Sequence, residues 1–242
     1  MAITKVTSGV LAADAVGVAT LSATGTASSS TFLRGDNAWA SAAAGLNSVQ
    51  TITATGTWTK PTGITKVIVE VQAAGGGGGS NGGSGGNYNG GSGGGGAYAR
   101  KFLDVTNIDT ATVTVGAAGA IATAGGTSSF AKLAGSGSFT TITCAGGGGG
   151  VTAPTPGTSQ GNGGVGAAVP TTGDYNVGGG NGTSGGSGAN NVAGASVLGV
   201  TSHIGAGVNP PTALGYGQGG PSGSSTSANP GAAGVVIVWE YK

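Results

Sequence analysis

The chain has 242 residues, of which 57 are glycine and 6% are charged, and its formal net charge is +1. This near-neutral balance lacks the clustered Lys and Arg of phosphate-binding surfaces and so excludes nucleic acid as a partner. A lone Cys144 excludes an intrachain disulfide framework and a cysteine metal cluster.

The apolar content is low for the length of the chain, which predicts a thin core that needs oligomerisation or an unusual backbone-bonded architecture. No run of eighteen apolar residues exists to span a membrane. The N-terminal stretch MAITKVTSGVLAADAVGVATLSA has one lysine and a weak apolar run broken by Asp14, so we expect no signal peptide.

Residues 1–45 are rich in Ala, Thr and Ser and show neither a long helical period nor regular strand alternation. They predict an extended segment that needs partner chains to bury its large apolar residues. Arg34-Gly35-Asp36 spells an integrin motif, but its context, SSSTFLRGDNAWA, favours a structural turn whose two charges pair locally or across chains. The residues expected to hold a trimer or attach the chain are Phe32, Leu33, Arg34, Asp36 and Trp39.

Alternation of period two begins at Val49. TITATGTWTKP, residues 51–61, predicts one strand that ends at Pro61, because proline cannot donate to a central ladder. In the next strand, ITKVIVEVQA, Val67, Val69 and Val71 share one face, while Lys66, Ile68, Glu70 and Gln72 share the other.

Further strands are predicted at 97–105, 110–119, 128–134, 138–146 and 235–241, with a hairpin around Gly135-Ser136-Gly137. No amphipathic helix of useful length is present. The predicted fold class is therefore all-β, a short antiparallel, sandwich-like framework of about seven strands interrupted by glycine-rich excursions at 75–96 and 146–234.

Only seven of the 57 glycines precede residue 75, so the glycine-rich region begins abruptly. Polar residues recur every third position in it, as at Asn81, Ser84 and Asn87. Period three is that of the polyproline-II-type helix, which has no internal hydrogen bonds. We therefore expect stacked polyglycine-II-type helices bonded backbone to backbone. The alternative is a flexible Gly/Ser linker.

Three blocks, TWTKPTGITKVIVEVQAAGGGGG, AYARKFLDVTNIDTATVTVGAAGA and GAAGVVIVWEY, resemble the glycine-rich receptor-binding domain of bacteriophage tail fibres and adhesins. The resemblance covers about residues 50–242, and SSSTFLRGDNAWA is similar to a junction found upstream of fibre tip domains. It implies a homotrimeric fibre on the virion whose loops touch a host receptor. Residues 1–49 would trimerise and attach to other virion structural proteins, and residues 50–242 would form the tip.

The large residues within the glycine zones are the candidates for binding a host surface glycan or outer-membrane protein, because aromatic anchors lose little entropy on binding. They and their polar neighbours are Asn87, Tyr88, Asn89, Asp174, Tyr175, Asn176, His203 and Tyr216. Each tyrosine could instead only cover the end of a helix stack, and His203 could be a loop residue bonded to backbone.

The sequence predicts no enzyme, with no catalytic residues, no metal and no cofactor. GxSxG recurs four times through glycine density alone, and a nucleophile elbow also needs a helix and a histidine partner. Two alternatives to an adhesin remain open: a capsid or head-decoration fibre without an obligatory receptor role, and a secreted glycine-rich structural or ice-binding protein.

Overall fold

A computed structural model describes residues 23–29, 31–41, 45–80, 90–153, 160–186, 191–199, 203–204, 215–223 and 229–242. The chain divides into two compact units, residues 1–45 and 46–242. Within these described ranges there is no helix, long and apolar or otherwise, and every pairing between named strands is antiparallel. The prediction of an all-β fold with antiparallel sheets is confirmed.

The first unit contains a hairpin that the sequence did not predict. Its strands, β1 (Thr31–Leu33) and β2 (Trp39–Ser41), are too short to show alternation. The turn between them closes with hydrogen bonds between Arg34 and both Asn37 and Ala38, and Asn37 has a φ of 60°. The Arg34 and Asp36 side chains pair at 3.1 Å, so the local pairing expected for this turn is present.

The second unit is built on a five-stranded sheet with the strand order β10-β6-β5-β13-β3. Its strands are β3 (Leu46–Ile52), β5 (Lys66–Gln72), β6 (Tyr98–Asp104), β10 (Tyr175–Val177) and β13 (Val235–Tyr241). Leu46 pairs with Tyr241, so the chain enters this sheet beside its own C-terminus.

A four-stranded sheet packs against the first, with the order β4-β7-β8-β9. Its strands are β4 (Gly56–Thr59), β7 (Thr110–Thr114), β8 (Ser128–Ala134) and β9 (Ile142–Cys144). The predicted β8–β9 hairpin is confirmed, although only Ser128–Phe130 pair with β9. Two short strands, β11 (Asn191–Val192) and β12 (His203–Ile204), form a separate ladder within the glycine-rich region.

The single strand predicted over 51–61 is wrong. β3 ends at Ile52 and β4 begins at Gly56, and the two strands belong to different sheets. The apolar–polar alternation continues across the break, so the pattern does not reveal that the chain changes sheet. Trp58, the one large apolar residue of β4, lies buried between the sheets.

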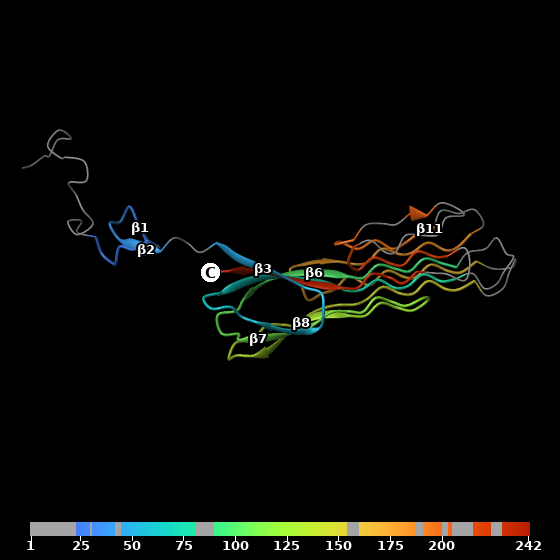
Figure 1. The fold of residues 1–242 in the computed structure, drawn as a ribbon, viewed down its shortest axis with the longest axis horizontal. Helices are drawn as coiled ribbons and strands as arrows, with labels where there is room; N and C mark the ends of the chain where they lie inside the picture. The colour runs from blue at the N-terminus through green and yellow to red at the C-terminus, as the bar shows by residue number, and fades with distance from the viewer. Residues whose placement is uncertain are drawn as a thin grey trace, which may run out of the picture. The chain divides into compact units, whose positions relative to one another are not determined.

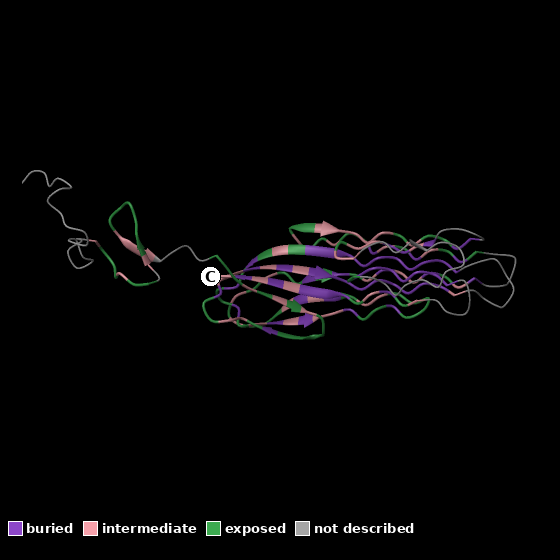
Figure 2. Cartoon of the chain, turned by 45° about the horizontal axis from the view of Figure 1, so that its top comes forward, coloured by how far each residue is buried: buried purple, intermediate pink, exposed green. Residues whose placement is uncertain are grey.

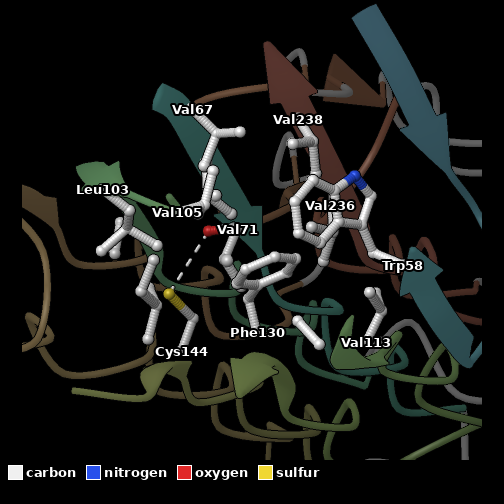
Figure 3. Close-up of a cluster of buried hydrophobic side chains, with 14 of the residues drawn as sticks. Trp58, Val67, Val71, Leu103, Val105, Val113, Phe130, Cys144, Val236 and Val238 are labelled. Carbon is white, nitrogen blue, oxygen red and sulfur yellow. Dashed lines mark hydrogen bonds between the residues drawn. The ribbon is translucent and has the colours of Figure 1, made fainter. Parts of the chain in front are cut away.

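The hydrophobic core fills the space between the two sheets (Figure 3). Val67, Val69 and Val71 of β5 are completely buried there, on the face that their spacing predicts. Phe130 packs against Trp58 with ring centroids 5.7 Å apart. The core is small, which agrees with the apolar content of the sequence.

A buried carboxylate ties the two sheets together at one end of this core. Glu240 of β13 is fully buried and accepts hydrogen bonds from Trp58 Nε1 at 2.7 Å, Gln50 Nε2 at 2.7 Å and Ser48 Oγ at 2.5 Å. These donors come from β3 and β4. A buried charge is tolerated only when its oxygens are hydrogen-bonded, and here three neutral donors serve it.

The glycine-rich segments leave the sheets at the end opposite the C-terminus and run side by side as a bundle (Figure 1). Residues 73–79 and 90–97 are buried along their whole described length and lie in its middle (Figure 2). We call these two segments the central runs.

Backbone hydrogen bonds of the central runs rotate among three neighbours with a period of three residues. The amides of Gly91, Gly94 and Ala97 donate to one segment, at Val151, Gly148 and Ala145. Those of Ser92 and Gly95 donate to a second, at Thr183 and Gly180, and those of Gly93 and Gly96 to a third, at Gly220 and Gly217. The carbonyl groups of Gly75–Gly79 accept in a similar rotation. The buried N–H and C=O groups of the central runs therefore find hydrogen-bond partners in the backbones of neighbouring segments.

Glycine is required in these runs for close approach, not for backbone conformation. None of the glycines of residues 75–79 or 90–96 has a left-handed φ. A Cβ added at Gly77 would lie 1.9 Å from the carbonyl oxygen of Ala120, and one at Gly95 would lie 1.9 Å from that of Ala195. Real Cβ atoms do not approach backbone so closely, so only glycine fits.

Period three also governs burial in the flanking segment 160–169. Asn162, Val165 and Ala168 are exposed, whereas Gly161, Gly164 and Ala167 are buried. The larger side chains Asn162 and Val165 therefore face away from the neighbouring backbones, whereas the buried positions hold only glycine or alanine.

Candidate functional site

The outer face of the five-stranded sheet, the face turned away from the core, carries large side chains. Antiparallel register places Ile68 of β5 opposite Phe102 of β6, and Glu70 opposite Arg100. Arg100 lies opposite Tyr175 of β10 in turn. Opposite residues on one face have their Cβ atoms within about 5.5 Å, so these side chains form one continuous surface.

A hollow of about 260 Å³ lies on this face where β10 begins. We call it the outer-face hollow, and its lining residues are Ile68, Arg100, Phe102, Asp174 and Tyr175. Phe102 is 54% exposed and Tyr175 is 60% exposed. Both residues are thus largely exposed to solvent, although the chain has few aromatic residues.

The loop that carries Asp174 is held in place from several sides. Asp174 Oδ2 accepts the backbone N–H of Phe102 at 2.8 Å, and the Asp174 N–H donates to the Arg100 carbonyl. Asn176 uses its side-chain amide to bond both the N–H and the C=O of Gly173. Lys101 Nζ donates to the Thr172 carbonyl at 3.1 Å. The hollow is therefore formed before any ligand arrives.

Glu70 organises the side chains beside the hollow. Its Oε1 accepts Trp239 Nε1 at 3.1 Å and lies 4.0 Å from Arg100 Nε. Burial raises the pKa of Tyr98 well above its ordinary value, and the neighbouring Glu70 carboxylate raises it further. Tyr98 therefore stays neutral, and its ring supports Tyr175 edge-on with centroids 6.2 Å apart.

An exposed ion pair lies beyond Ile68 and Phe102 in the register. Lys66 Nζ pairs with Asp104 Oδ2, and Asp104 Oδ1 accepts the Thr106 N–H at 2.9 Å. The hydrogen bond from Lys66, with those from Thr106, holds the pKa of Asp104 well below its usual range. Asp104 is thus engaged by Lys66 and by its own turn.

Among the described residues, only some candidates of the glycine zones line the outer-face hollow. Asp174 and Tyr175 line the outer-face hollow, whereas Asn176 pairs opposite Ala99 and braces the loop from inside. Tyr216 is partly exposed in a different segment, where its carbonyl accepts Ser196 Oγ at 2.5 Å. His203 lies in β12, but its side chain is outside the described part, as are Asn87, Tyr88 and Asn89.

In the first unit, the residues predicted for trimerisation or attachment lie on and beside the β1–β2 hairpin. Phe32 is 49% exposed and Leu33 is 38% exposed, while Trp39 is half-buried. Arg34 and Asp36 satisfy each other in the turn. The hairpin therefore presents apolar side chains to solvent rather than free charge.

The titratable groups do not form a recognisable catalytic arrangement within the described residues. No group of three or more His, Cys, Asp and Glu side chains is placed there to hold a metal. Cys144 lies in the core with its Sγ 3.3 Å from the Val71 carbonyl (Figure 3), and burial raises the pKa of its thiol to about 12. A protonated, buried thiol is a poor nucleophile.

Sequence reasoning missed Arg100, Phe102 and Ile68 as site residues. The signal was available in the strand AYARKFLDV, where period two places Tyr98, Arg100 and Phe102 on one face. What the pattern does not show is that this face stays uncovered, since that depends on where the glycine-rich segments pack.

A family model for the glycine-rich domain matches residues 48–241, most of the chain. The chain belongs to this glycine-rich domain family. A comparison with curated proteins gives no match for it.

Proposed function

We propose that the chain is a fibre or adhesin subunit of a bacteriophage virion, which assembles as a homotrimer and binds a receptor on the host surface. The receptor is a surface glycan or an outer-membrane protein. The observation that carries the proposal is the backbone-bonded bundle, which projects from a small β-framework at the end away from the C-terminus. The resemblance of three sequence blocks to phage fibre tips supports it.

We further propose that the central runs and their neighbours are polyglycine-II-type helices. The support is the threefold rotation of their hydrogen bonds and the exposure of every third residue in 160–169. Helices of this kind have three residues per turn and no internal hydrogen bonds, so each must be bonded to its neighbours. A bundle of them is stiff without a large apolar core, which suits a projecting tip.

Residues 1–45 attach the subunit to other virion proteins and hold the trimer. The exposed Phe32 and Leu33 of the hairpin support this role, because a monomer gains nothing from leaving them in water. Three receptor sites on one trimer gain avidity from their effective concentration, so each single site needs only weak affinity. The proposal includes no catalytic step.

The test is deletion of the gene from the phage that encodes it, followed by measurement of the adsorption rate to host cells. Adsorption is expected to fall strongly and to return when the full-length chain is supplied in trans. If wild-type particles carry the chain but particles from the deletion strain adsorb normally, the chain is a decoration fibre. A chain that is absent from purified particles would instead favour the secreted structural protein.

A further inference from the structure

We propose that the outer-face hollow binds a neutral saccharide, the terminal sugar of the host receptor. This inference rests on the proposed function and narrows it, because it selects a glycan over a protein and places the contact on the sheet rather than on the glycine-rich bundle. The ligand would stack on Tyr175 and Phe102 and bond Arg100 and Asp174.

The two aromatic rings supply an apolar platform that the fold itself does not use. Core aromatics such as Trp58 and Phe130 are completely buried, whereas Phe102 and Tyr175 are 54% and 60% exposed. Tyr175 is supported from behind by Tyr98, edge to face. The C–H face of a pyranose ring is apolar and covers such rings well, and an aromatic side chain loses little entropy when it does so.

The polar groups of the hollow match hydroxyl groups rather than a net charge. Arg100 offers guanidinium donors and Asp174 offers carboxylate acceptors, so the lining carries one positive and one negative charge. Glu70 adds a second carboxylate next to Arg100. An anionic ligand would meet no excess of positive charge, whereas a sugar hydroxyl both donates and accepts and is served by either group.

The geometry of the hollow is fixed in advance. The Asp174 carboxylate is held by the Phe102 N–H, and the loop behind it is held by Asn176, Lys101 and Thr172. Tyr175 follows directly on this anchored loop. A site whose groups are already placed avoids the ordering cost that otherwise weakens binding of a small ligand.

The size of the hollow favours a saccharide over a protein as its ligand. The hollow of about 260 Å³ is just below the range of about 300–1,000 Å³ that is typical for drug-sized ligands, so it suits one sugar ring or the end of a chain. A stable protein–protein contact buries about 800 Å² on each partner, far more than this hollow provides. Trimeric avidity compensates for the weak affinity expected of a single ring.

The experiment measures binding of neutral methyl glycosides to the full-length protein by saturation-transfer NMR and calorimetry. The probes are methyl glucoside, galactoside, mannoside and N-acetylglucosaminide, with a methyl glucuronide as the acidic comparison. We expect at least one neutral glycoside to bind at millimolar concentration. Tyr175→Ala and Phe102→Ala should each lower its association constant about two- to tenfold, the range of one aromatic contact.

Matched control variants test whether a loss of binding arises at the hollow. Tyr175→Phe retains the ring and should bind nearly as the wild type, and Leu133→Ala removes an exposed apolar side chain of β8 and should change nothing. The Tyr175 and Phe102 side chains both lie at the surface, so the melting temperatures of Tyr175→Ala and Phe102→Ala should match that of the wild type. If one of these two variants fails to fold, the other still tests whether an aromatic ring of the hollow contributes to binding.

Three results would overturn the inference: no neutral glycoside binds, the glucuronide binds more tightly, or both ring variants bind as the wild type does. Adsorption of phage carrying Tyr175→Ala with Phe102→Ala is measured in parallel. Normal adsorption by this double variant, together with loss of adsorption on gene deletion, would overturn the saccharide site and leave the adhesin role standing. Loss of adsorption without glycoside binding would indicate a protein receptor.

Discussion

At Gly77 the added methyl group of alanine would meet the Ala120 carbonyl oxygen at 1.9 Å, and the Gly119 carbonyl oxygen lies close behind it. Backbone atoms of a hydrogen-bonded segment cannot move aside without breaking their own bonds. Gly56, at the start of β4, differs completely, because a Cβ there would have no heavy atom within 4 Å. Gly77 and Gly56 therefore differ sharply in how well each position tolerates a side chain.

Gly77→Ala should lower the free energy of unfolding by about 3 kcal/mol or more, at the upper end of overpacking costs. For a chain of this size the loss corresponds to a fall of about 6–12 °C in melting temperature. Thermal unfolding followed by circular dichroism or calorimetry measures it.

The control is Gly56→Ala, which should change the free energy of unfolding by less than about 1 kcal/mol. Equal melting temperatures for the two variants would mean that the bundle does not pack as described. Gly85 and Gly86, where the sequence alone suggests the same test with valine, lie outside the described residues.

At the residue scale, the sequence predicts inward positions better than outward ones. Val67, Val69 and Val71 are β-branched, alternate strictly and lie in the core as expected. Tyr175 stands out because it is a rare large residue among glycines. Phe102 does not, since an aromatic residue in a strand is usually buried and its exposure depends on long-range packing.

Among the elements, β13 depends most on distant partners, because it lies between β5 and β3 and carries Glu240 toward β4. The Glu240 carboxylate joins strands from both sheets through three neutral donors. Trp58 Nε1 can only donate, so it needs an oxygen at this point. The arrangement predicts that the shape and the acceptor at residue 240 matter more than the charge.

Glu240→Gln and Glu240→Met form a matched pair that tests this. Glutamine keeps one oxygen for Trp58 and Gln50 and offers its amide to Ser48, so the free energy of unfolding should fall by less than about 1 kcal/mol. Methionine fills the same space without an acceptor and strands the Trp58 N–H, which should cost about 2–3 kcal/mol. Denaturant unfolding at neutral pH measures both variants. Equal stability of the two would show that the hydrogen bonds to residue 240 contribute little.

The strand pattern of the sheets was largely predictable, because β5 alternates with period two and β13 is a nearly continuous run of β-branched and aromatic residues. Which strands pair with one another was not predictable from the sequence. The break between β3 and β4 interrupts no alternation, and β10 has only three residues among glycines. Its position at the edge of the sheet follows from the anchored loop at Gly173, which no periodicity records.

On the scale of the whole molecule, the thin core raises the question of what stabilises the chain. The bundle answers part of it through backbone hydrogen bonds, which do not require apolar side chains. The first unit, with Phe32 and Leu33 exposed on its hairpin, has no comparable internal support among its described residues. Association of three chains through this unit would cover those side chains.

The native mass from light scattering should therefore be about 67 kDa, three copies of the 22.2 kDa chain. Replacing Phe32 and Leu33 together by serine should shift the mass toward the monomer, because the apolar contact is lost. Leu133→Ser, an exposed change on β8, is the control and should leave the trimer intact. A wild-type monomer would contradict the assembly proposed here.

The contact between glycine and backbone in the bundle has a consequence for how the sequence can evolve. In an ordinary core, an enlarged side chain can be accommodated when a facing side chain becomes smaller. Here the facing atom at Gly77, Gly91 or Gly95 is a carbonyl oxygen, which every amino acid carries and no substitution can shrink. Second-site suppressors are therefore unavailable at these positions, and each glycine is fixed independently of its neighbours. Larger side chains are left to exposed positions such as Asn162 and Val165, where they face away from the neighbouring segments.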